Sequence, residues 1–430
     1  TTASAPPRIE PRTEPTPAPL SLMQQRVWYL EQLQLGRTVF NVPSAHHLAG
    51  ALDEAAFTRA FAEMVRRQPI LRTVIGMSGD APAQFVLPPF AVALFPAEDL
   101  SGRGKDERER ELARRIEDEI ARPFELGGAP LFRARMFRLG PEEHVLFFMP
   151  HHLIWDGWSF DLFYEEMADL YAAFREGRTP LRPAPTVSYG DFAAWHRGWL
   201  AGPELERQLA YWKDRLAGAP DTLDLPTDRP RPPTQTGDGA TEWLALDAGT
   251  CEALRAVGAR EGATLFMTLL AAWAMLLHRL TGQREVVIGT PVRGRNLPEL
   301  EPVMGFFVNA LPLRLAVDPG QSFLEILRAV RAEVVAAFGH QDVPFEHLVR
   351  VLDLPRDESR FPLYQAFFSY QDARQRPAAW GNLAHRNVPV FQPAAAQDVA
   401  LWFLDGPDGL VGGLNYNVDI LEAETAIRCK

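Results

Sequence analysis

Cysteine is almost absent from this sequence: Cys251 and Cys429 are the only two among 430 residues. Such sparse use argues against a disulfide framework, and no Cys-x-x-Cys pair is present to hold zinc or to exchange thiols and disulfides. We therefore expect no structural cross-links, no metal site and no redox chemistry.

The sequence also lacks long apolar runs and an excess of basic residues. No stretch of about 18 consecutive apolar residues occurs, and the chain does not open with the basic and apolar segments of a secretory signal. The net charge of −11 disfavours a nucleic-acid surface, because neutralising phosphates requires clustered lysine and arginine. These absences predict a cytoplasmic protein with neither a membrane span nor a nucleic-acid partner.

Proline is concentrated at the start of the chain. Residues 1–19 contain six prolines with arginine and glutamate between them, a composition typical of an extended linker. A linker in this position, in a chain that begins with threonine, suggests that another module precedes it, although this end can equally reflect a cloning choice.

Helical and strand patterns alternate after residue 19, and no tandem repeat is present. The continuous apolar run at residues 144–149, which ends at Pro150, predicts a strand buried on both faces. Helical spacing resumes at residues 158–174. Further helices are expected at residues 21–33, 52–67, 264–280, 323–338 and 344–352, and further strands at residues 241–246, 286–289 and 310–317.

The mixture of helices and strands in both halves predicts the α/β class. With 47% hydrophobic residues, the chain can bury a large core. We expect a Pro-rich linker at residues 1–19 and two lobes of comparable size, an N-terminal lobe at residues 20–187 and a C-terminal lobe at residues 188–430. The charge-rich run at residues 102–118 mixes both signs and predicts a solvated helix with i, i+4 pairs.

Common catalytic motifs are missing. The sequence contains no Gly-x-x-x-x-Gly-Lys-Ser/Thr loop and no Gly-x-Gly-x-x-Gly after a strand, and it has neither a Gly-x-Ser-x-Gly elbow nor a His-Glu-x-x-His helix. Nucleotide, dinucleotide, serine hydrolase and zinc protease functions are therefore disfavoured.

Two histidines follow the predicted strand at residues 144–149. In the run from His151 to Gly157, His151 and His152 are adjacent, and Asp156 lies four residues after His152. Acyl transfer to an amine requires removal of a proton as the tetrahedral species forms, and a neutral imidazole suits this task near neutral pH. Adjacent side chains of an extended segment point in opposite directions, so one histidine is expected to act and the other to orient.

Spacing alone does not assign the roles of the other residues in this run. Asp156 could orient the imidazole, or an arginine could hold it away. Gly157 permits a sharp turn and a close backbone approach, so its N–H group is a candidate donor to a developing oxyanion. The alternative interpretation is that a His-His pair at the end of a strand only satisfies local backbone groups.

The remaining histidines lack such surroundings. His46 and His47 form a second adjacent pair in an expected strand, but no carboxylate follows them. We therefore interpret this pair as surface or packing residues. The other histidines that lack a local carboxylate-glycine pair such as Asp156-Gly157, and that we also expect to be structural, are His144, His196, His278, His340 and His385.

Several further motifs accompany the His-His-x-x-x-Asp-Gly run, and together they resemble the condensation-domain superfamily of nonribosomal peptide synthetases, which includes chloramphenicol acetyltransferase-like folds. The resemblance extends in order along nearly the whole chain. Its motifs here are Ser21 to Leu30, Tyr189 to Trp195, Ile288 to Arg295, Gly305 to Asn309, His340 to Glu346 and Arg356 to Leu363. A single short motif can arise by chance, whereas this set in this order is specific.

The resemblance implies a role for each matching residue. His152 becomes the catalytic histidine, acting as a base or as a positioner of the amine. His151 and Asp156 become structural, with Asp156 pairing with Arg295 across the lobe interface. The supporting or structural residues expected around the active site are His151, Asp156, Gly157, Trp158, Arg295 and Arg26.

The resemblance also implies a fold and a set of partners. It predicts two chloramphenicol acetyltransferase-like lobes in a V-shape with a central tunnel, which the 4'-phosphopantetheine arms of donor and acceptor carrier domains would enter from opposite faces. The domain itself would bind no cofactor and no metal. Adenylation or polyketide modules are expected as neighbours, and the excised domain is expected to be monomeric.

The resemblance is incomplete at a few positions. The second motif of the family often reads Arg-His-Glu-x-Leu-Arg-Thr, whereas this chain has Gln-Pro-Ile-Leu-Arg between Arg67 and Thr73. Trp155 stands where smaller residues are common and could narrow the tunnel and favour a particular donor, and Phe361 replaces a frequent asparagine. The chain ends at Lys430, before the family's usual last helix. None of these departures touches the expected chemistry.

The implied activity is amide bond formation, by transfer of a carrier-bound acyl or peptidyl thioester to the amine of a carrier-bound aminoacyl thioester. The first motif is most similar to the class that joins an L-configured or nonchiral donor to an L-amino acid, and starter domains that N-acylate with a fatty acid resemble the same class. Ester formation by the same histidine and a noncatalytic carrier-docking role are the alternatives. Epimerase domains share the His-His motif, but the first, sixth and seventh motifs favour condensation.

Overall fold

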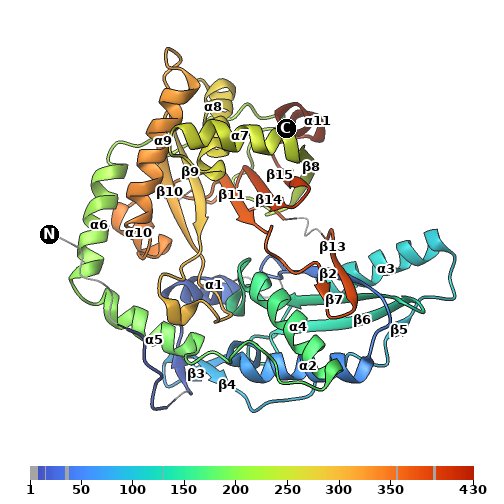
Figure 1. Ribbon diagram of the computed structural model, residues 1–430. Coiled ribbons are helices and arrows are strands. Elements are labelled where there is room, and N and C mark those ends of the chain that lie inside the picture. Colours follow the sequence, from blue (N-terminus) through green and yellow to red (C-terminus); the bar gives the residue numbers. More distant parts are fainter. Residues whose placement is uncertain (1–7, 15, 34–37, 129, 355–356, 391–393) are drawn as a thin grey trace. The chain divides into compact units, whose positions relative to one another are not determined.

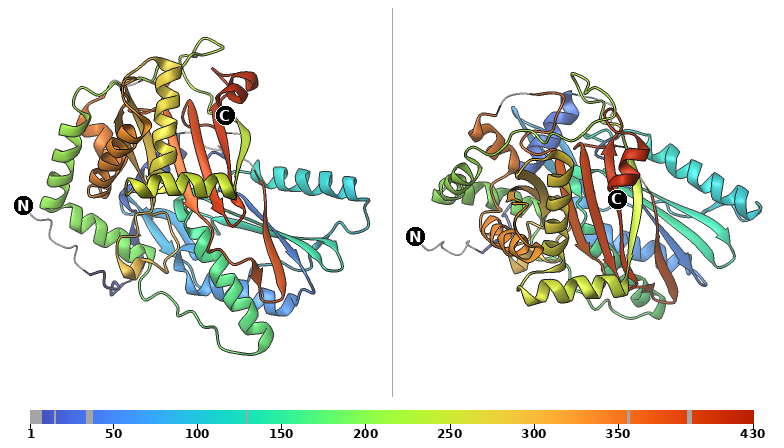
Figure 2. Two further views of the ribbon diagram at one scale, coloured as in Figure 1. Left: turned by 45° about the horizontal axis from the view of Figure 1, so that its top comes forward. Right: turned by 90° about the horizontal axis from the view of Figure 1, so that it is seen from above.

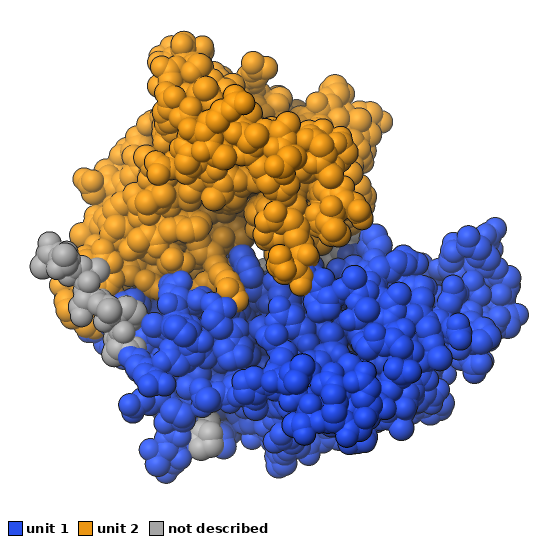
Figure 3. Space-filling view, viewed as in Figure 1, with its two compact units in different colours: residues 1–201, 295–307, 376–392 blue, residues 202–294, 308–375, 393–430 orange. Residues whose placement is uncertain are grey.

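Two compact units make up the chain. The computed structural model describes residues 8–14, 16–33, 38–128, 130–354, 357–390 and 394–430 (Figure 1). Unit 1 contains residues 1–201, 295–307 and 376–392, and unit 2 contains residues 202–294, 308–375 and 393–430 (Figure 3). Both units combine helices and strands, which confirms the α/β class expected from the sequence.

Unit 1 has one large and one small sheet. Its elements are β1 (Ala18–Pro19), α1 (Leu22–Leu33), β2 (Ser44–Ala49), α2 (Glu54–Arg67), η1 (Pro69–Arg72), β3 (Thr73–Ser78), β4 (Ala81–Val86), β5 (Glu98–Asp99), α3 (Lys105–Ile120), β6 (Phe132–Gly140), β7 (Glu143–Pro150), η2 (His152–Ile154), α4 (Ser159–Glu176), α5 (Tyr189–Leu200), η3 (Pro298–Leu300), β12 (Ala379–Trp380) and β13 (Leu383–Val388). The large sheet has the order β12, β13, β2, β7, β6, β5, and the small sheet has the order β1, β4, β3. Only the β5–β6 pair is parallel among the strand pairs described in this unit.

Strand β7 is the central support of the large sheet, and both of its faces are buried. Val145 and Phe147 pack on one face in a cluster with residues of α3. On the other face, Phe148 stacks on Phe163 of α4, with ring centroids 4.7 Å apart. The prediction of a strand buried on both faces at residues 144–149 is thus confirmed.

Two segments from the later part of the chain complete unit 1. Strand β13, residues 383–388, pairs with β2 in antiparallel register (Figure 1). Trp380 of β12 is fully buried. Segment 295–307, which contains the short helix η3, joins the same unit. Unit 1 therefore extends past residue 187, where the sequence pattern placed the lobe boundary, because part of its large sheet comes from near the end of the chain.

Part of the expected Pro-rich linker packs on unit 1. Residues 18–19 form β1, which pairs with β4, and the side chains of Ile9 and Ala18 are buried. Residues 1–7 and 15 lie outside the described part of the chain. Two side chains of this stretch, Ile9 and Ala18, thus contribute to the core of unit 1, while most of its other described residues are exposed.

Unit 2 is built on a single six-stranded sheet of order β10, β9, β11, β14, β15, β8. Its elements are α6 (Pro203–Leu216), β8 (Gly239–Asp247), α7 (Ala248–Arg260), α8 (Leu265–Thr281), β9 (Glu285–Val292), β10 (Asn309–Ala316), α9 (Phe323–Phe338), α10 (Phe345–Leu352), β11 (Ala366–Asp372), β14 (Val399–Gly406), β15 (Gly409–Asn417) and α11 (Ala423–Cys429). Strand β11 is parallel to both of its neighbours, and the other pairs are antiparallel.

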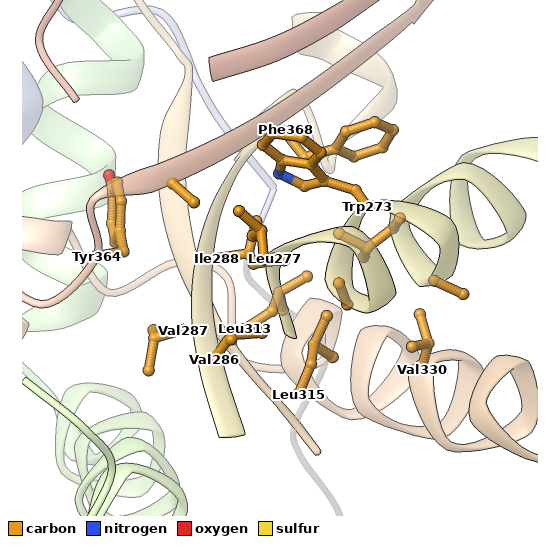
Figure 4. Close-up of a cluster of buried hydrophobic side chains, with 14 of the residues drawn as sticks. Trp273, Leu277, Val286, Val287, Ile288, Leu313, Leu315, Val330, Tyr364 and Phe368 are labelled. Carbon is orange, nitrogen blue, oxygen red and sulfur yellow. The ribbon is translucent and has the colours of Figure 1, made fainter. Parts of the chain in front are cut away.

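The core of unit 2 lies between this sheet and helices α7, α8 and α9, which cover one of its faces (Figure 2). Trp273 and Leu277 of α8 pack with Ile288 of β9 and Phe368 of β11 (Figure 4). Along β14, Phe403 is buried in this core, whereas its immediate neighbours Trp402 and Leu404 are partly exposed. Such alternation is expected of a sheet that has one covered face.

Side-chain caps mark the starts of several helices. Ser322 forms a capping box with Glu325 at the start of α9, and the Thr264 hydroxyl accepts from the Met267 N–H at the start of α8. These oxygens satisfy backbone N–H groups that a helix leaves without a partner. Every helix and strand expected from the sequence is present within a few residues of its predicted bounds.

Within the part of the chain that the structure describes, no single helix is long and apolar enough to cross a membrane. Helices α7 and α8, which are bent by 95° at their junction, meet the criteria of length and composition only when taken together. Much of α8 is buried in the core of unit 2.

Gly289 of β9 provides a test of this packing. A Cβ atom on Gly289 would come within 2.3 Å of the Tyr364 ring, so we expect Gly289→Ala to lower the free energy of unfolding by about 2 kcal/mol through overpacking. Urea denaturation measures this change. The control is Gly198→Ala on α5, where the added Cβ meets nothing within 4 Å and should be neutral or slightly stabilising. Equal stability of the two variants would contradict the packing described.

Candidate active site

The candidate residues lie in unit 1, between the end of β7 and the start of α4. Strand β7 ends at Pro150, His151 continues the extended backbone, and His152 begins the short helix η2. Helix α4 then starts at Ser159. The His-His-x-x-x-Asp-Gly run thus occupies a junction between a strand and a helix, where loop residues are held by a rigid support.

The His151 side chain is turned into the core of unit 1. It is 2% exposed and contacts the rings of Phe40 and Phe124. Its Nδ1 accepts a hydrogen bond from the Leu153 N–H at 3.1 Å, so the neutral ring carries its proton on Nε2. That nitrogen lies 3.6 Å from Glu31 Oε1. These contacts anchor the turn that follows β7.

The His152 side chain has different neighbours and is partly exposed. Its ring packs against Phe306 at a steep angle, with centroids 4.8 Å apart and planes at 66°. The backbone N–H of His152 donates to the Phe40 carbonyl at 2.8 Å. Among the described residues, the buried ring atom Nδ1 has no hydrogen-bond partner. Packing and backbone contacts therefore set the position of this ring.

The surroundings of His152 favour the neutral imidazole. Burial lowers the pKa of His152 from its ordinary value of 6.5, and the charge of Asp156 opposes part of that shift. The neutral ring is thus the main form at pH 7, and it is the form that can accept a proton.

Asp156 pairs with Arg295 in the interior of unit 1. Both side chains are 0% exposed, and Arg295 donates from Nη1 to Asp156 Oδ2 at 3.0 Å and from Nη2 to Oδ1 at 3.2 Å. This is the bidentate geometry in which a guanidinium and a carboxylate bind strongly. The resemblance predicted such a pair across the lobe interface. Both residues instead belong to unit 1, because residues 295–307 fold with the N-terminal part of the chain.

Three further donor groups complete the surroundings of the Asp156 carboxylate. The Ser159 N–H donates to Oδ1 at 2.8 Å, and the Ser159 hydroxyl lies 2.9 Å from the same oxygen. The Phe307 N–H donates to Oδ2 at 3.0 Å. A carboxylate offers about four lone pairs, so Arg295, Ser159 and Phe307 leave none to orient an imidazole. Of the two roles that spacing left open for Asp156, the structure shows the one in which an arginine holds it.

Residues 295–307, here called the returning segment, are held by side chains from the first part of unit 1. The Ser159 hydroxyl lies 3.0 Å from both the N–H and the carbonyl oxygen of Gly305. The Tyr189 hydroxyl donates to the Phe306 carbonyl at 2.5 Å, and burial raises the pKa of Tyr189, which keeps it protonated. A Cβ atom on Gly305 would come within 2.2 Å of the Tyr189 ring, so a side chain would force the segment away.

The other predicted residues surround the same junction. Gly157 is exposed, and Trp158 is partly exposed at the N-cap position of α4. Arg26 is partly exposed on α1, a helix that packs against η2. Gln24 of α1 donates from Nε2 to the Leu153 carbonyl at 2.7 Å. All of the predicted site residues therefore lie in unit 1.

The expectation that Trp155 narrows an open passage is wrong. Its side chain is 0% exposed and packs against Phe148, Phe160 and Phe163. The short helix η2 ends just before Trp155 and directs the indole into the hydrophobic core of unit 1. The large residue at this position fills the core.

Three positioning side chains were not singled out from the sequence. Gln24 and Tyr189 occur within motifs that carried the resemblance, and Ser159 follows Gly157 by two positions. Their distant partners in the structure include residues 117 to 146 positions away along the chain. Local spacing carries no information about such distant contacts.

The histidines and carboxylates do not gather into a metal centre in the described part of the chain. Among the residues described, no group of three or more His, Cys, Asp or Glu side chains could hold a metal ion. In the second histidine pair, His46 Nδ1 lies 3.2 Å from His385 Nε2, and the Trp380 ring stacks on His385. This cluster joins β2 to the β12–β13 hairpin and has a packing role.

The family model for the condensation domain matches residues 15–388. This chain belongs to the condensation domain family. Condensation domains of nonribosomal peptide synthetases are acyltransferases that form amide bonds. The motifs quoted from the sequence therefore identified the family correctly.

Individual relatives agree with this assignment. A linear gramicidin synthase protein of Brevibacillus parabrevis is 40% identical to the condensation domain over 412 residues, which are 95% of this chain and 8% of that protein. The X-domain from teicoplanin biosynthesis, also solved in a complex with OxyB, is 30% identical with a TM-score of 0.85 and covers 98% of this chain and 94% of its own. The first condensation domain of the CDA synthetase is 25% identical with a TM-score of 0.82. The match covers 96% of this chain and 94% of the CDA synthetase domain.

The buried ion pair leads to a prediction about stability. Asp156→Asn leaves the Arg295 charge uncompensated inside the condensation domain, so we expect the free energy of unfolding in urea to fall by about 3 kcal/mol. The control is Asp118→Asn, which removes a surface partner of Arg114 that is 59% exposed and should cost less than about 0.5 kcal/mol. A loss for Asp156→Asn no larger than that of the control would show that Arg295 does not depend on this carboxylate.

The environment of His152 leads to a second prediction. In histidine-labelled protein, the NMR signal of the His152 ring, assigned by its loss in His152→Ala, should titrate below pH 6.5 because burial disfavours the imidazolium. The unfolded chain binds this proton more readily than the folded protein, so the His152 contribution to stability should weaken as the pH falls below 6.5. A ring that titrates above 6.5 would contradict the burial described.

Proposed function

We propose that this condensation domain transfers the acyl or peptidyl group of a carrier-bound thioester to the amine of a carrier-bound aminoacyl thioester, and so forms an amide bond. The observation that carries the proposal is the state of His152, a partly exposed, neutral imidazole packed on Phe306. Its neighbour Asp156 is fully engaged by Arg295 and other donors. An imidazole in this state can take up or orient a proton near neutral pH.

The reaction makes one bond, breaks one bond and moves one proton. The amine nitrogen attacks the thioester carbonyl carbon, and the carbon–sulfur bond breaks after the carbon–nitrogen bond has formed. The nitrogen gives up a proton, and the departing sulfur takes one up. His152 either relays this proton as a base or holds the amine in place through a hydrogen bond. Both routes need no cofactor or metal bound by the domain.

We infer that both substrates arrive on 4'-phosphopantetheine arms of carrier domains. The chain spans only 8% of the gramicidin synthase protein that it matches, which supports an origin in a multidomain synthetase with adenylation or polyketide modules as neighbours. Tethering raises the effective concentration of both reactants, and orientation in a site lowers the barrier further. We also propose that the excised domain is a monomer and that the synthetase is cytoplasmic. The supporting roles of Gly157, Trp158 and Arg26 stay predictions.

A noncatalytic docking domain is the second candidate function. The likeness to the X-domain solved in a complex with OxyB favours it, because a domain of this fold there has a protein partner. The complete set of His151, His152 and Asp156, with its bound Arg295, favours catalysis instead. Ester formation and starter N-acylation would use the same imidazole and differ only in the acceptor or donor.

The carrier assay tests the proposal directly. Intact-protein mass spectrometry should show the acyl mass on the acceptor carrier when an acyl-loaded donor carrier and an aminoacyl-loaded acceptor carrier are mixed with the domain. His152→Ala should reduce the rate on the order of 100-fold or more, as expected when a proton-transferring group is lost, and should keep the fold. The matched control is His47→Ala, at a partly exposed histidine of β2, with an unchanged rate.

Two results would contradict the proposed function. A folded His152→Ala protein with a normal rate removes the proton-transfer role of this residue. Carrier binding without transfer across several donors favours the docking domain.

A further inference from the structure

Gln68 and Glu166 form a buried polar pair in unit 1 that the chemistry above does not use. Gln68 follows α2 and is 0% exposed, and Glu166 lies on α4 and is 6% exposed. The Gln68 side chain donates from Nε2 to Glu166 Oε1 at 2.5 Å. Gln68 stands at the position where the second motif of the family often has histidine.

The Gln68 amide also binds two backbone groups of the returning segment. It donates from Nε2 to the Pro302 carbonyl at 2.9 Å, and its Oε1 accepts from the Met304 N–H at 3.1 Å. Turning the amide over would set nitrogen against an N–H group and oxygen against a carbonyl, so these partners define its orientation. Both hydrogens of the amide are used, one on Pro302 and one on Glu166.

Glu166 accepts the second hydrogen of the Gln68 amide. Burial raises the pKa of Glu166 to about 7, while the bond from Gln68 and the charges of Arg67 and Arg182 lower it and the charge of Glu63 raises it. Glu166 Oε2 has no hydrogen-bond partner among the described residues, so a proton there meets no acceptor. The ionised carboxylate binds the amide more strongly than the neutral acid does.

We propose that Gln68 and Glu166 are a positioning pair, which holds the backbone at residues 302–304 and thereby sets Phe306 against the His152 imidazole. This inference rests on the proposed function of His152. The pair binds the chain two to four residues before Phe306, in a stretch whose next residues are bound to other side chains of unit 1. A displacement of about 1 Å at such a site can change a rate on the order of 100-fold.

The charge of Glu166 distinguishes positioning from simple support of the fold. Because its pKa is raised in the folded protein, the unfolded chain binds this proton less readily, and stability falls as the pH rises from 4.5 toward 7. A neutral side chain at this position should therefore stabilise the protein above pH 7. The same change weakens the hold on Gln68. A positioning role thus predicts that stability and activity change in opposite directions.

Glu166→Gln in the carrier assay tests this prediction. At pH 8 we expect a kcat about tenfold lower with an unchanged KM for the acceptor carrier, as for loss of precise placement, together with a higher Tm. The control is Glu176→Gln, the same change at the end of α4 in a residue that is 52% exposed, which should keep the wild-type rate. A wild-type rate in Glu166→Gln, or a lower rate with a lower Tm, would overturn the proposal.

The pH dependence gives a second readout. The ratio of the wild-type rate to the Glu166→Gln rate cancels the ionisation of His152 and of the substrate amine, which both proteins share. When Glu166 is fully ionised, this ratio should be about ten. It should rise from about two at pH 6 to about nine at pH 8, because it follows the titration of one group, Glu166, whose pKa is about 7. A ratio that stays flat over this range contradicts the proposal.

Amide hydrogen exchange gives a readout that needs no carrier. In Gln68→Leu the Met304 amide should lose its acceptor and exchange at least about tenfold faster, while the Phe307 amide, bound to Asp156, stays protected. If the wild-type domain transfers acyl groups and the Met304 amide stays protected in Gln68→Leu, the proposal of a positioning pair is wrong and the proposed function stands. If wild type transfers nothing, the proposed function fails as well. Should Gln68→Leu not fold, the rate ratio of Glu166→Gln decides.

Discussion

The Asp156 carboxylate is shielded from solvent, and five donor groups lie around its two oxygens. A charge in the interior of a protein persists only when it is paired and hydrogen-bonded. Its donors belong to Ser159, Arg295 and Phe307, so this one carboxylate is satisfied only when the returning segment is in place. His152 in turn packs on Phe306 of that segment. The position of the imidazole thus depends on an ion pair in which the imidazole has no part.

The adjacent histidines His151 and His152 lie in different surroundings. His151 is surrounded by aromatic rings and has a backbone donor on Nδ1, which fixes its tautomer and its place. His152 shares the strand end, but the carboxylate nearest to it in the sequence, Asp156, is bound elsewhere. The Asp156 carboxylate is occupied by Arg295, Ser159 and Phe307, and burial lowers the pKa of the His152 imidazole. The two rings therefore have different partners although they are adjacent in the sequence.

Local patterns in the sequence were sufficient for the individual elements, because apolar runs and helical spacing report burial directly. The strand at β7 and the helix at α4 are examples. The resemblance, and not spacing, predicted the pair of Asp156 with Arg295 that the structure shows, whereas the catalytic role of His152 stays a prediction. The pairing of β13 with β2 and the binding of Pro302 by Gln68 join residues more than 200 positions apart, which no local pattern encodes. Trp155 was misjudged because a single turn of η2 decides on which side its ring lies.

Because unit 1 is built from three separate parts of the chain, its first 201 residues are synthesised before the later segments that complete it. When residue 201 has been synthesised, β2 still lacks its neighbour β13, and Arg295 does not yet exist. An unpaired strand edge and an uncompensated carboxylate make such a nascent chain prone to wrong pairings. The large sheet of unit 1 can be completed only after residue 388 has been synthesised. By then strands β8 to β11 of unit 2 have been synthesised as well. A cut between residues 187 and 188 would therefore separate β2 from β13 and Asp156 from Arg295, while all six strands of the unit 2 sheet would stay together in the second half.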